Sequence, residues 1–333
     1  MFLTVSLVKF STIYSPEFVS SNLKWNLLRE KETMSFFDKL VVWSLPLIPK
    51  PVVGYFSRHY IAGPKLDDAI AVVKELNAHH AMATMDLLGE ESMNKEEAEA
   101  AVVEYLHILR AIDEYQLDAN LSVKPTQMGL NIDQEYCYQN IRRIVQEAKK
   151  FNNFVRIDME DHTATTATIE MYLKLKQEFG NHVGTVIQAY LRRTSADINL
   201  LLKEKPNLRL CKGIYVEARE IAYKDMAIIN ENYKYNLEKL LSNRCYTGIA
   251  THDEKLVWQA LMLIEKYGLK KDEYEFQMLL GVDEQLRKII IDAGHRLRVY
   301  VPYGEQWYPY STRRLKENPR MAGYVFKRIF GLS

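Results

Sequence analysis

One stretch near the C-terminus decides the fold: Arg298-Val-Tyr-Val-Pro-Tyr-Gly-Glu-Gln-Trp-Tyr-Pro-Tyr-Ser-Thr-Arg-Arg-Leu-Lys-Glu-Asn-Pro319. It begins as a β-branched and aromatic strand, crosses a Pro/Gly turn, and restarts as a helix after Pro309. A helical period of about 100° per residue places four polar side chains on one face: Tyr310, Arg313, Arg314 and Glu317. Two adjacent guanidiniums suit a carboxylate ligand, whereas a solvated, salt-bridged surface helix is the alternative interpretation.

The position of this helix favours ligand binding, because it follows a strand end and an aromatic loop, where α/β barrels place their sites. The same alternation of strand and helix runs back along the chain. The predicted strands are 81–86, 118–124, 154–158, 183–188, 208–212, 246–251, 274–277 and 296–301. The predicted helices are 66–80, 95–115, 141–151, 165–179, 196–204, 217–241, 254–267 and 284–293.

Eight strand–helix units favour a closed α/β barrel, which we place at residues 63–333. An open doubly wound sheet is the competing architecture, but its Gly-x-Gly-x-x-Gly fingerprint occurs nowhere among the 14 glycines. A helical segment is expected at 34–62. Residues 1–33 match no pattern. The residues just before Met34 are ones that purine-rich codons encode, which suggests a translated ribosome-binding site of a bacterial gene. A genuine flexible tail is the alternative for this extension.

The composition is that of a soluble globular protein, with 47% apolar and 26% charged residues. A net charge of +1 provides no general field for attracting nucleic acid. Three widely spaced cysteines form neither a disulfide framework nor a zinc motif, which indicates a reducing compartment. No uninterrupted apolar run of about 20 residues and no secretory signal is visible.

Polar residues end nearly every predicted strand, although the rest of these strands is apolar. They are Asp86, Lys124, Asp158, Gln188, Arg209, Thr251, His252, Gln277 and Tyr300. Buried charges are costly without partners, so the set predicts a functional cavity. Cations outnumber carboxylates among the candidates, and this excess predicts an anionic ligand.

Two chemistries compete with simple anion binding. The segment Asp158-Met-Glu-Asp-His162 contains metal-type ligands, but its spacing fits no zinc motif. We therefore expect a carboxylate that orients a lysine or arginine, and no metal. Lys124 or Lys212 could alternatively act as the Schiff-base nucleophile of an aldolase-type lyase.

Seven motifs, in order along the chain, resemble one family. They are Ser122-Val-Lys-Pro-Thr-Gln-Met-Gly129, Val155-Arg-Ile-Asp-Met-Glu160, Val186-Ile-Gln-Ala-Tyr190, Arg209-Leu-Cys-Lys-Gly-Ile-Tyr215, Thr251-His-Asp253, Tyr274-Glu-Phe-Gln277 and Tyr310-Ser-Thr-Arg-Arg314. The chain resembles the flavin-dependent proline dehydrogenases of the monofunctional bacterial type over roughly residues 60–330. The resemblance implies a distorted (βα)8 TIM barrel whose last helix covers the C-terminal mouth, and FAD bound without a Rossmann domain.

The resemblance also implies a role for each matched position. Asp158 would orient the cationic groups, and Arg209 would stabilise negative charge beside the flavin's reactive nitrogen. The expected substrate-binding residues are Lys124, Tyr300, Tyr310, Arg313 and Arg314. The expected cofactor-binding residues are Met159, Gln188, Lys212, Gly213, Ile214, Thr251, His252 and Gln277. Cys211 and Ile214 depart from the family's usual aliphatic and small residues beside the flavin.

The implied reaction oxidises L-proline to 1-pyrroline-5-carboxylate, the first step of proline degradation to glutamate. Electrons would pass to a membrane quinone, and a separate dehydrogenase would take the product onward. We expect a cytoplasmic protein, with the aromatic segment before Gly63 and the basic tail at 323–330 as candidates for peripheral membrane contact. The alternatives are that both segments pack on the barrel, and that the chain is a non-enzymatic, membrane-associated binding protein.

Overall fold

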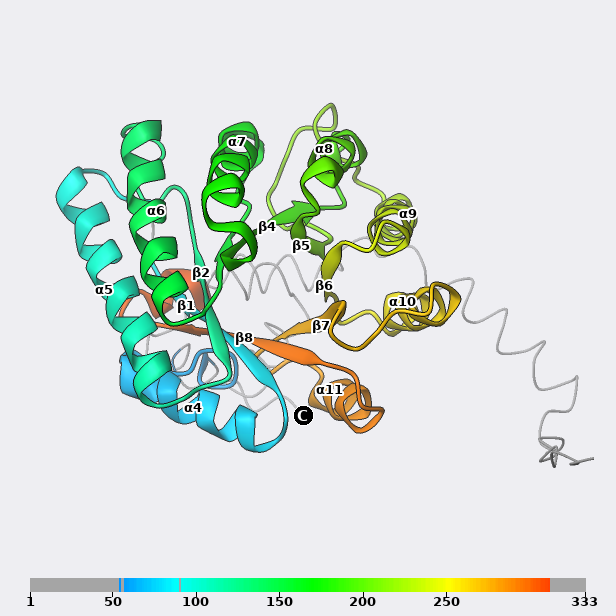
Figure 1. Ribbon diagram of the computed structural model, residues 1–333, viewed down its shortest axis with the longest axis horizontal. Helices are drawn as coiled ribbons and strands as arrows, with labels where there is room; N and C mark the ends of the chain where they lie inside the picture. The colour runs from blue at the N-terminus through cyan, green and yellow to red at the C-terminus, as the bar shows by residue number, and fades with distance from the viewer. Residues whose placement is uncertain (1–53, 55–56, 90, 312–333) are drawn as a thin grey trace, which may run out of the picture. The chain divides into compact units, whose positions relative to one another are not determined.

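Eight parallel strands close into a barrel in the order β1 to β8 (Figure 1). The computed structural model describes residues 54, 57–89 and 91–311. The strands are β1 Met82–Leu87, β2 Ala119–Val123, β3 Val155–Ile157, β4 Val183–Gln188, β5 Asn207–Cys211, β6 Tyr246–Ala250, β7 Tyr274–Leu279 and β8 Leu297–Tyr303. The prediction of a (βα)8 barrel is confirmed, and the doubly wound sheet is excluded because β1 pairs with β8.

Helices surround this barrel and connect each strand to the next (Figure 1). They are α4 Leu66–Ala78, α5 Lys95–Glu114, α6 Gln134–Lys150, α7 His162–Phe179, α8 Thr194–Leu201, α9 Met226–Ser242, α10 Glu254–Lys266 and α11 Glu284–Asp292. Short 3-10 turns extend two of them, η2 Gly180–His182 after α7 and η3 Leu202–Glu204 after α8. The helix α4 precedes the barrel and contacts β1 and β8.

Aspartate N-caps correct three predicted helix starts. The α6 helix begins at Gln134 and not at 141, because the Asp133 side chain accepts a hydrogen bond from Tyr136 N. Asp161 caps α7 in the same way, so this helix begins at His162, three residues before the predicted start. The predicted start at 217 is wrong by more than two turns, because Asp225 caps α9 and residues 217–225 form an irregular loop.

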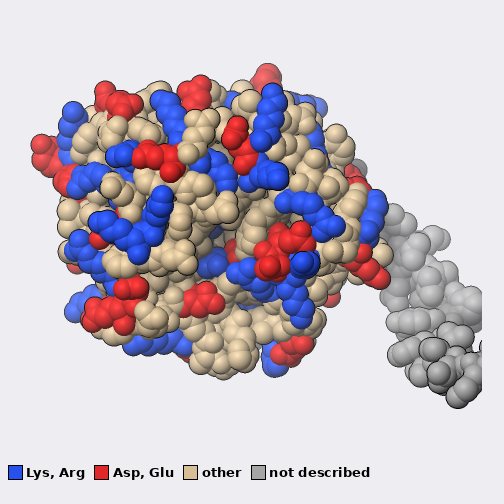
Figure 2. Space-filling model, in the orientation of Figure 1, with Lys and Arg blue, Asp and Glu red and all other residues tan. Residues whose placement is uncertain are grey.

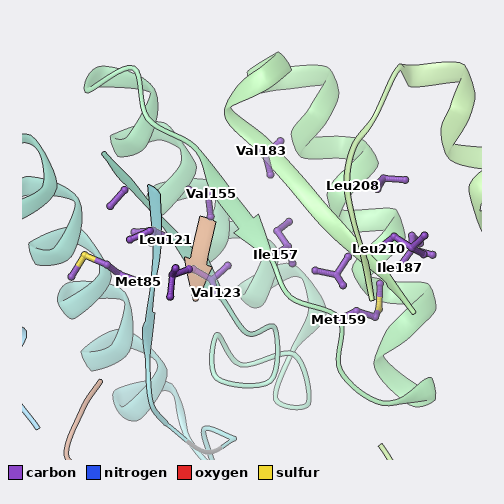
Figure 3. Packing of buried hydrophobic residues seen from close by; sticks show 14 of the residues in the cluster. Met85, Leu121, Val123, Val155, Ile157, Met159, Val183, Ile187, Leu208 and Leu210 are labelled. Carbon is purple, nitrogen blue, oxygen red and sulfur yellow. The ribbon is translucent and has the colours of Figure 1, made fainter. Parts of the chain in front are cut away.

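Strand alternation separates two environments. Residues of one parity point outward and pack against the helices, as Figure 3 shows for Met85, Leu121, Val155 and Ile187. These residues belong to one continuous apolar core. Residues of the other parity face the barrel interior, where Thr84 Oγ1 donates to Asn120 Oδ1 at 2.6 Å. The interior is therefore polar, which explains why apolar strands carry a second series of charged and amide side chains.

The C-terminal segment is helical from Trp307 to Ser311, so this helix begins three residues before the predicted position after Pro309. Pro309 lies within its first turn, where the missing N–H has no intrahelical partner to lose. Trp307 also lies against Gly54, since a Cβ at Gly54 would stand 3.2 Å from the indole. The predicted placement of the last helix over the barrel mouth, with Arg313 and Arg314, lies outside the described residues.

The described residues belong to one compact unit, Pro49–Arg313. Nearly all of the predicted segments 1–33 and 34–62 lies outside the described residues. No helix within the described part of the chain has both the length and the apolar content needed to cross a membrane. Basic and acidic side chains alternate over the face in Figure 2, in keeping with the net charge of +1.

Candidate active site

Asp158 is the centre of a hydrogen-bonded cluster inside the barrel, directly after β3. Its Oδ1 accepts from Ser122 Oγ at 2.6 Å and from Arg209 Nη1 at 2.7 Å. Its Oδ2 accepts from the Tyr300 hydroxyl at 2.8 Å. The donors come from three other strands, β2, β5 and β8, so closure of the barrel is what assembles the cluster. Three donors hold the carboxylate in one orientation and leave it little freedom to rotate.

Arg209 is held from two further sides. Its Nε donates to Gln277 Oε1 at 2.5 Å, and the Tyr300 ring centroid lies 5.3 Å from its Cζ. Burial in this polar and aromatic surrounding raises the pKa of Tyr300 well above its usual value of 10, with Asp158 and Asp86 adding to the effect. The Tyr300 hydroxyl is therefore protonated at neutral pH and acts as a donor.

Lys124 forms an ion pair with Asp86, which lies on β1 and is fully buried. Burial disfavours the charged form of Lys124, but Asp86 and Asp158 outweigh it and raise the lysine pKa. Burial also raises the pKa of Asp86, a shift that Lys124 opposes. A lysine held in its protonated form is a poor Schiff-base nucleophile, so this geometry argues against the lyase interpretation for Lys124.

The expected cofactor residues form a second group at the same end of the barrel. Gln188 Nε2 donates to Met159 O at 3.3 Å, whereas the buried Gln188 Oε1 has no hydrogen-bond partner among the described residues. Thr251 N donates to Gln277 O at 3.3 Å, and His252 Nε2 accepts from Leu279 N at 2.9 Å. An orphaned, buried amide oxygen suits a ligand that carries a hydrogen-bond donor.

A loop follows β5 and presents the remaining predicted cofactor residues. Lys212 Nζ lies 2.9 Å from Asp253 Oδ2. Gly213 has φ +103°, and a Cβ there would stand 2.1 Å from the Tyr190 ring, so only glycine fits. Ile214 is 57% exposed, which leaves an apolar side chain available for a ligand. The residues present thus fit a flavin: an orphaned acceptor, a cation and an exposed apolar side chain.

The same loop is anchored farther along by Glu217. This buried carboxylate accepts from His162 N at 2.8 Å and lies 2.5 Å from His162 Nδ1. The anchor explains why residues 217–225 do not continue as the predicted helix. Cys211, at the start of the loop, has its thiol pKa raised to about 11, mainly by burial, which argues against a reactive thiol.

The segment from Asp158 to His162 uses its polar groups separately. Glu160 accepts from Thr126 N at 2.8 Å and from Thr126 Oγ1 at 2.6 Å, and Asp161 caps α7. Among the residues that the structure describes, no group of three or more His, Cys, Asp or Glu side chains could hold a metal ion. Asp158 accepts a hydrogen bond from Arg209, and its role in orienting this arginine stays a prediction.

A cavity of about 420 Å³ lies at the opposite end of the barrel. Asp118, Asn120, Asn153 and Arg298 contribute to its lining, and they stand at or near the starts of their strands. Active sites of such barrels lie at the C-terminal ends of the strands. We therefore place the candidate active site at Asp158 and not at this cavity.

The structure brings Lys124, Asp158, Arg209, Gln277 and Tyr300 together in the barrel interior, and it buries Tyr310 at 8% exposure. Several polar partners in the described site received no role from the sequence, among them Asp86, Asp253 and Glu275. Asp86 was recognised as a strand-end residue, but its pairing with Lys124 depends on barrel closure. Glu275 shares the parity of Gln277, and that alternation is the signal that could have identified it.

The comparisons with known proteins agree with this architecture. A family model described as proline dehydrogenase matches residues 69–326. The chain belongs to the proline dehydrogenase family. Proline dehydrogenases are flavoenzymes that oxidise proline in the first step of its catabolism, so the chain is an oxidoreductase of proline catabolism.

Individual relatives support the same assignment. Proline dehydrogenase 1 of Bacillus subtilis subsp. natto is 38% identical over 82% of this chain and 90% of its own length. Proline dehydrogenase of Deinococcus radiodurans is 35% identical over 81% of this chain and 88% of its own length. Proline utilization A from Bdellovibrio bacteriovorus, inactivated by N-propargylglycine, superposes with a TM-score of 0.77 at 26% identity. That match covers 92% of this chain but only 39% of the longer protein.

Proposed function

We propose that this protein oxidises L-proline to 1-pyrroline-5-carboxylate with FAD as its cofactor. The observation that carries the proposal is the buried cluster in which Asp158 binds both Arg209 and Tyr300, with Lys124 paired to Asp86 beside it. The cluster combines fixed positive charge with an aromatic wall, which suits a small, cyclic amino acid. Family membership supplies the reaction class.

Lys124 would bind the proline carboxylate together with Arg313 and Arg314. Asp86, Asp158 and Glu160 favour the charged lysine, so its attraction for a carboxylate persists at neutral pH. Tyr300 and Tyr310 would wall the ring and exclude water from the reacting carbon. Asp158 would hold Arg209 and Tyr300 in place, so that neither must reorganise during reaction.

Bound FAD would supply the acceptor for the hydride that leaves the ring carbon beside the amine. Arg209 would place its charge beside the reactive nitrogen of the flavin, where negative charge develops. Met159, Gln188, Lys212, Gly213, Ile214, Thr251, His252 and Gln277 would hold the cofactor. The fit rests on the orphaned oxygen of Gln188 and on the exposed apolar side chain of Ile214.

The substrate amine must be deprotonated before its lone pair can assist hydride departure. The rate should therefore rise with pH toward the bound amine's pKa. The product would open to glutamate semialdehyde, the substrate class of a separate dehydrogenase. We place the protein in the cytoplasm, with electrons passing to a membrane quinone through peripheral contact.

A visible spectrum of purified protein tests the proposal. We expect flavin bands that bleach when L-proline is added anaerobically. A colourless protein that borohydride traps with a carbonyl substrate would overturn the proposal in favour of the lyase. If flavin bleaching and borohydride trapping are both absent, the protein is a binding protein without this chemistry. Arg313→Met should raise KM for proline far more than it lowers flavin content, and equal losses of both would contradict its role in substrate binding.

A further inference from the structure

A continuous row of buried side chains runs from Arg209 to the far end of the barrel. Arg209 Nε donates to Gln277 Oε1 at 2.5 Å, and Gln277 Nε2 donates to Glu275 Oε1 at 2.6 Å. Arg298 Nε donates to the same oxygen of Glu275 at 2.9 Å. All four side chains are at least 90% buried, so the row is shielded from solvent. The role proposed for Arg209 uses only the first member of this row.

Glu275 is the anion of the row, and it is 1% exposed. Burial alone would raise its pKa, but Arg298 and the hydrogen bonds from Arg298, Tyr246 and Gln277 outweigh burial and lower the pKa to about 2. The Tyr246 hydroxyl donates to Glu275 Oε2 at 2.8 Å. The carboxylate is therefore ionised at any pH where the protein works, and it can only accept hydrogen bonds.

This ionisation, together with the Arg209 guanidinium that can only donate, fixes which way the Gln277 amide faces. A side-chain amide has a donor end and an acceptor end that are similar in shape, so either orientation fits sterically. The Glu275 carboxylate admits only the NH2 end, and the carbonyl oxygen must then face Arg209. A neutral group at position 275 would accept both orientations. In the reversed orientation, the NH2 group would meet the Arg209 Nε–H, donor against donor.

A glycine opens the space for this connection. Arg209 on β5 and Glu275 on β7 are separated by β6, where Gly248 is paired in register with both. A Cβ at Gly248 would stand 2.4 Å from Gln277 Nε2. The missing side chain therefore allows the Gln277 amide to reach across a whole strand to Arg209.

We propose that Glu275 is a positioning residue, which acts through Gln277 to fix the orientation and the local charge of the Arg209 guanidinium. The inference deepens the proposed function and rests on it for the part that Arg209 plays beside the flavin. Within the described part of the chain, Glu275 accepts hydrogen bonds from Gln277, Arg298 and Tyr246. Glu275 acts on Arg209 through the Gln277 amide and through its own negative charge, which partly offsets the positive charge of Arg209.

Glu275→Gln tests the proposal, because it keeps the size of the side chain and removes its charge. The variant leaves Arg298 without its anion, so Glu275→Gln with Arg298→Met removes both buried charges and keeps the interior neutral. We expect both variants to loosen the Gln277 amide, so that the Arg209–Gln277 hydrogen bond is longer or broken in crystal structures. We also expect kcat to fall about tenfold or more, as for the loss of a group that orients a reacting residue, with KM for proline little changed.

The reduction potential of the bound flavin is a second readout that a purely structural role would not move. Glu275→Gln alone removes a negative charge and should make this potential more positive, because added electron density is then better stabilised. Glu275→Gln with Arg298→Met also removes a positive charge and should shift the potential less. Glu238→Gln is the matched control: it removes an exposed carboxylate, bonded to Lys266 and Tyr267, from the outside of the barrel. We expect this control to leave kcat, the potential and Arg209 unchanged.

Gly248→Ala separates orientation from charge. Its methyl group should displace the Gln277 amide while the Glu275–Arg298 pair stays intact, so kcat should fall with little change in potential. If Arg209 stays bonded to Gln277 and kcat is unchanged in the folded charge variants, the proposal is overturned. If proline fails to bleach the wild-type protein, the proposed function fails instead, while loss of the Arg209–Gln277 bond in the crystals would still support the positioning role.

Discussion

Arg209 and Asp158, 51 positions apart in the chain, meet through a hydrogen bond of 2.7 Å from Nη1 to Oδ1. The two side chains are 10% and 13% exposed, so the pair is screened weakly by solvent. Breaking such a pair leaves an uncompensated buried charge, which costs more than the pair itself contributes. The contact therefore makes Asp158 and Arg209 dependent on each other for position.

Asp158→Asn should lower kcat/KM for proline by roughly 10²- to 10³-fold, the range seen when one preorganised electrostatic contact is removed. The amide keeps the shape of the carboxylate but turns a donor toward Arg209 or Tyr300. Steady-state kinetics with an artificial electron acceptor would measure the loss. Retention of the wild-type rate would show that Asp158 has no role in catalysis.

Asp197→Asn is a suitable control for that measurement. Asp197 forms a comparable ion pair with Arg193 at 2.8 Å, but it lies on α8 outside the barrel. We expect an unchanged kcat and, because Asp197 is itself buried, a stability loss of about 1–3 kcal/mol.

Lys124→Met should lower stability by roughly 3–5 kcal/mol, because it leaves Asp86 buried without a cation. Asp86 has a raised pKa in the folded protein, so its contribution is complete below the unfolded value of 3.8 and is lost as pH rises through the folded value. The defect in thermal stability should therefore be larger at pH 8 than at pH 5. Asp86→Asn in the same chain should restore most of the stability but not the affinity for proline; a defect independent of pH would contradict this explanation.

Gly213→Ala should reduce both stability and flavin content, since the new methyl group would collide with the Tyr190 ring. Gly268→Ala provides a matched comparison. That glycine also has a positive φ, +55°, but no atom lies within 4 Å of the added Cβ. It should cost only about 1 kcal/mol of backbone strain. Flavin absorbance per protein distinguishes the two, and equal flavin content in both variants would argue against a close approach at Gly213.

Glu275 should make unfolding strongly dependent on acid pH. Its pKa falls from 4.5 to about 2 on folding, which corresponds to about 3 kcal/mol of stability. Because the folded pKa is depressed, this contribution is present above pH 4.5 and is lost as pH falls toward 2. Urea unfolding from pH 6 to pH 3 should show a shallower decline for Glu275→Gln with Arg298→Met than for the wild type. Parallel profiles would mean that Glu275 is not paired as the structure has it.

The strand alternation was predictable from local patterns. Ser122 and Lys124 share a parity, and Val123 between them is apolar, so one face of β2 had to be polar and the other buried. Helix starts were predicted less accurately, because apolar periodicity alone does not reveal that the side chains of Asp133 and Asp225 cap α6 and α9. Glu217 shows the limit of prediction from local patterns. The stretch around it resembles a helix, but Glu217 is held in a loop because it accepts a hydrogen bond from His162, 55 positions away.

The sequence by itself determined the order of strands and helices, the polar lining of the barrel and the family. These features depend on residue spacing along the chain, which is short-range information. Only the tertiary structure decided that Lys124 pairs with Asp86 and that Gln277 reaches Arg209 past Gly248. Such contacts join strands that are distant in sequence. They depend on how a closed barrel staggers its strands and on where a glycine, such as Gly248, leaves space between neighbouring side chains.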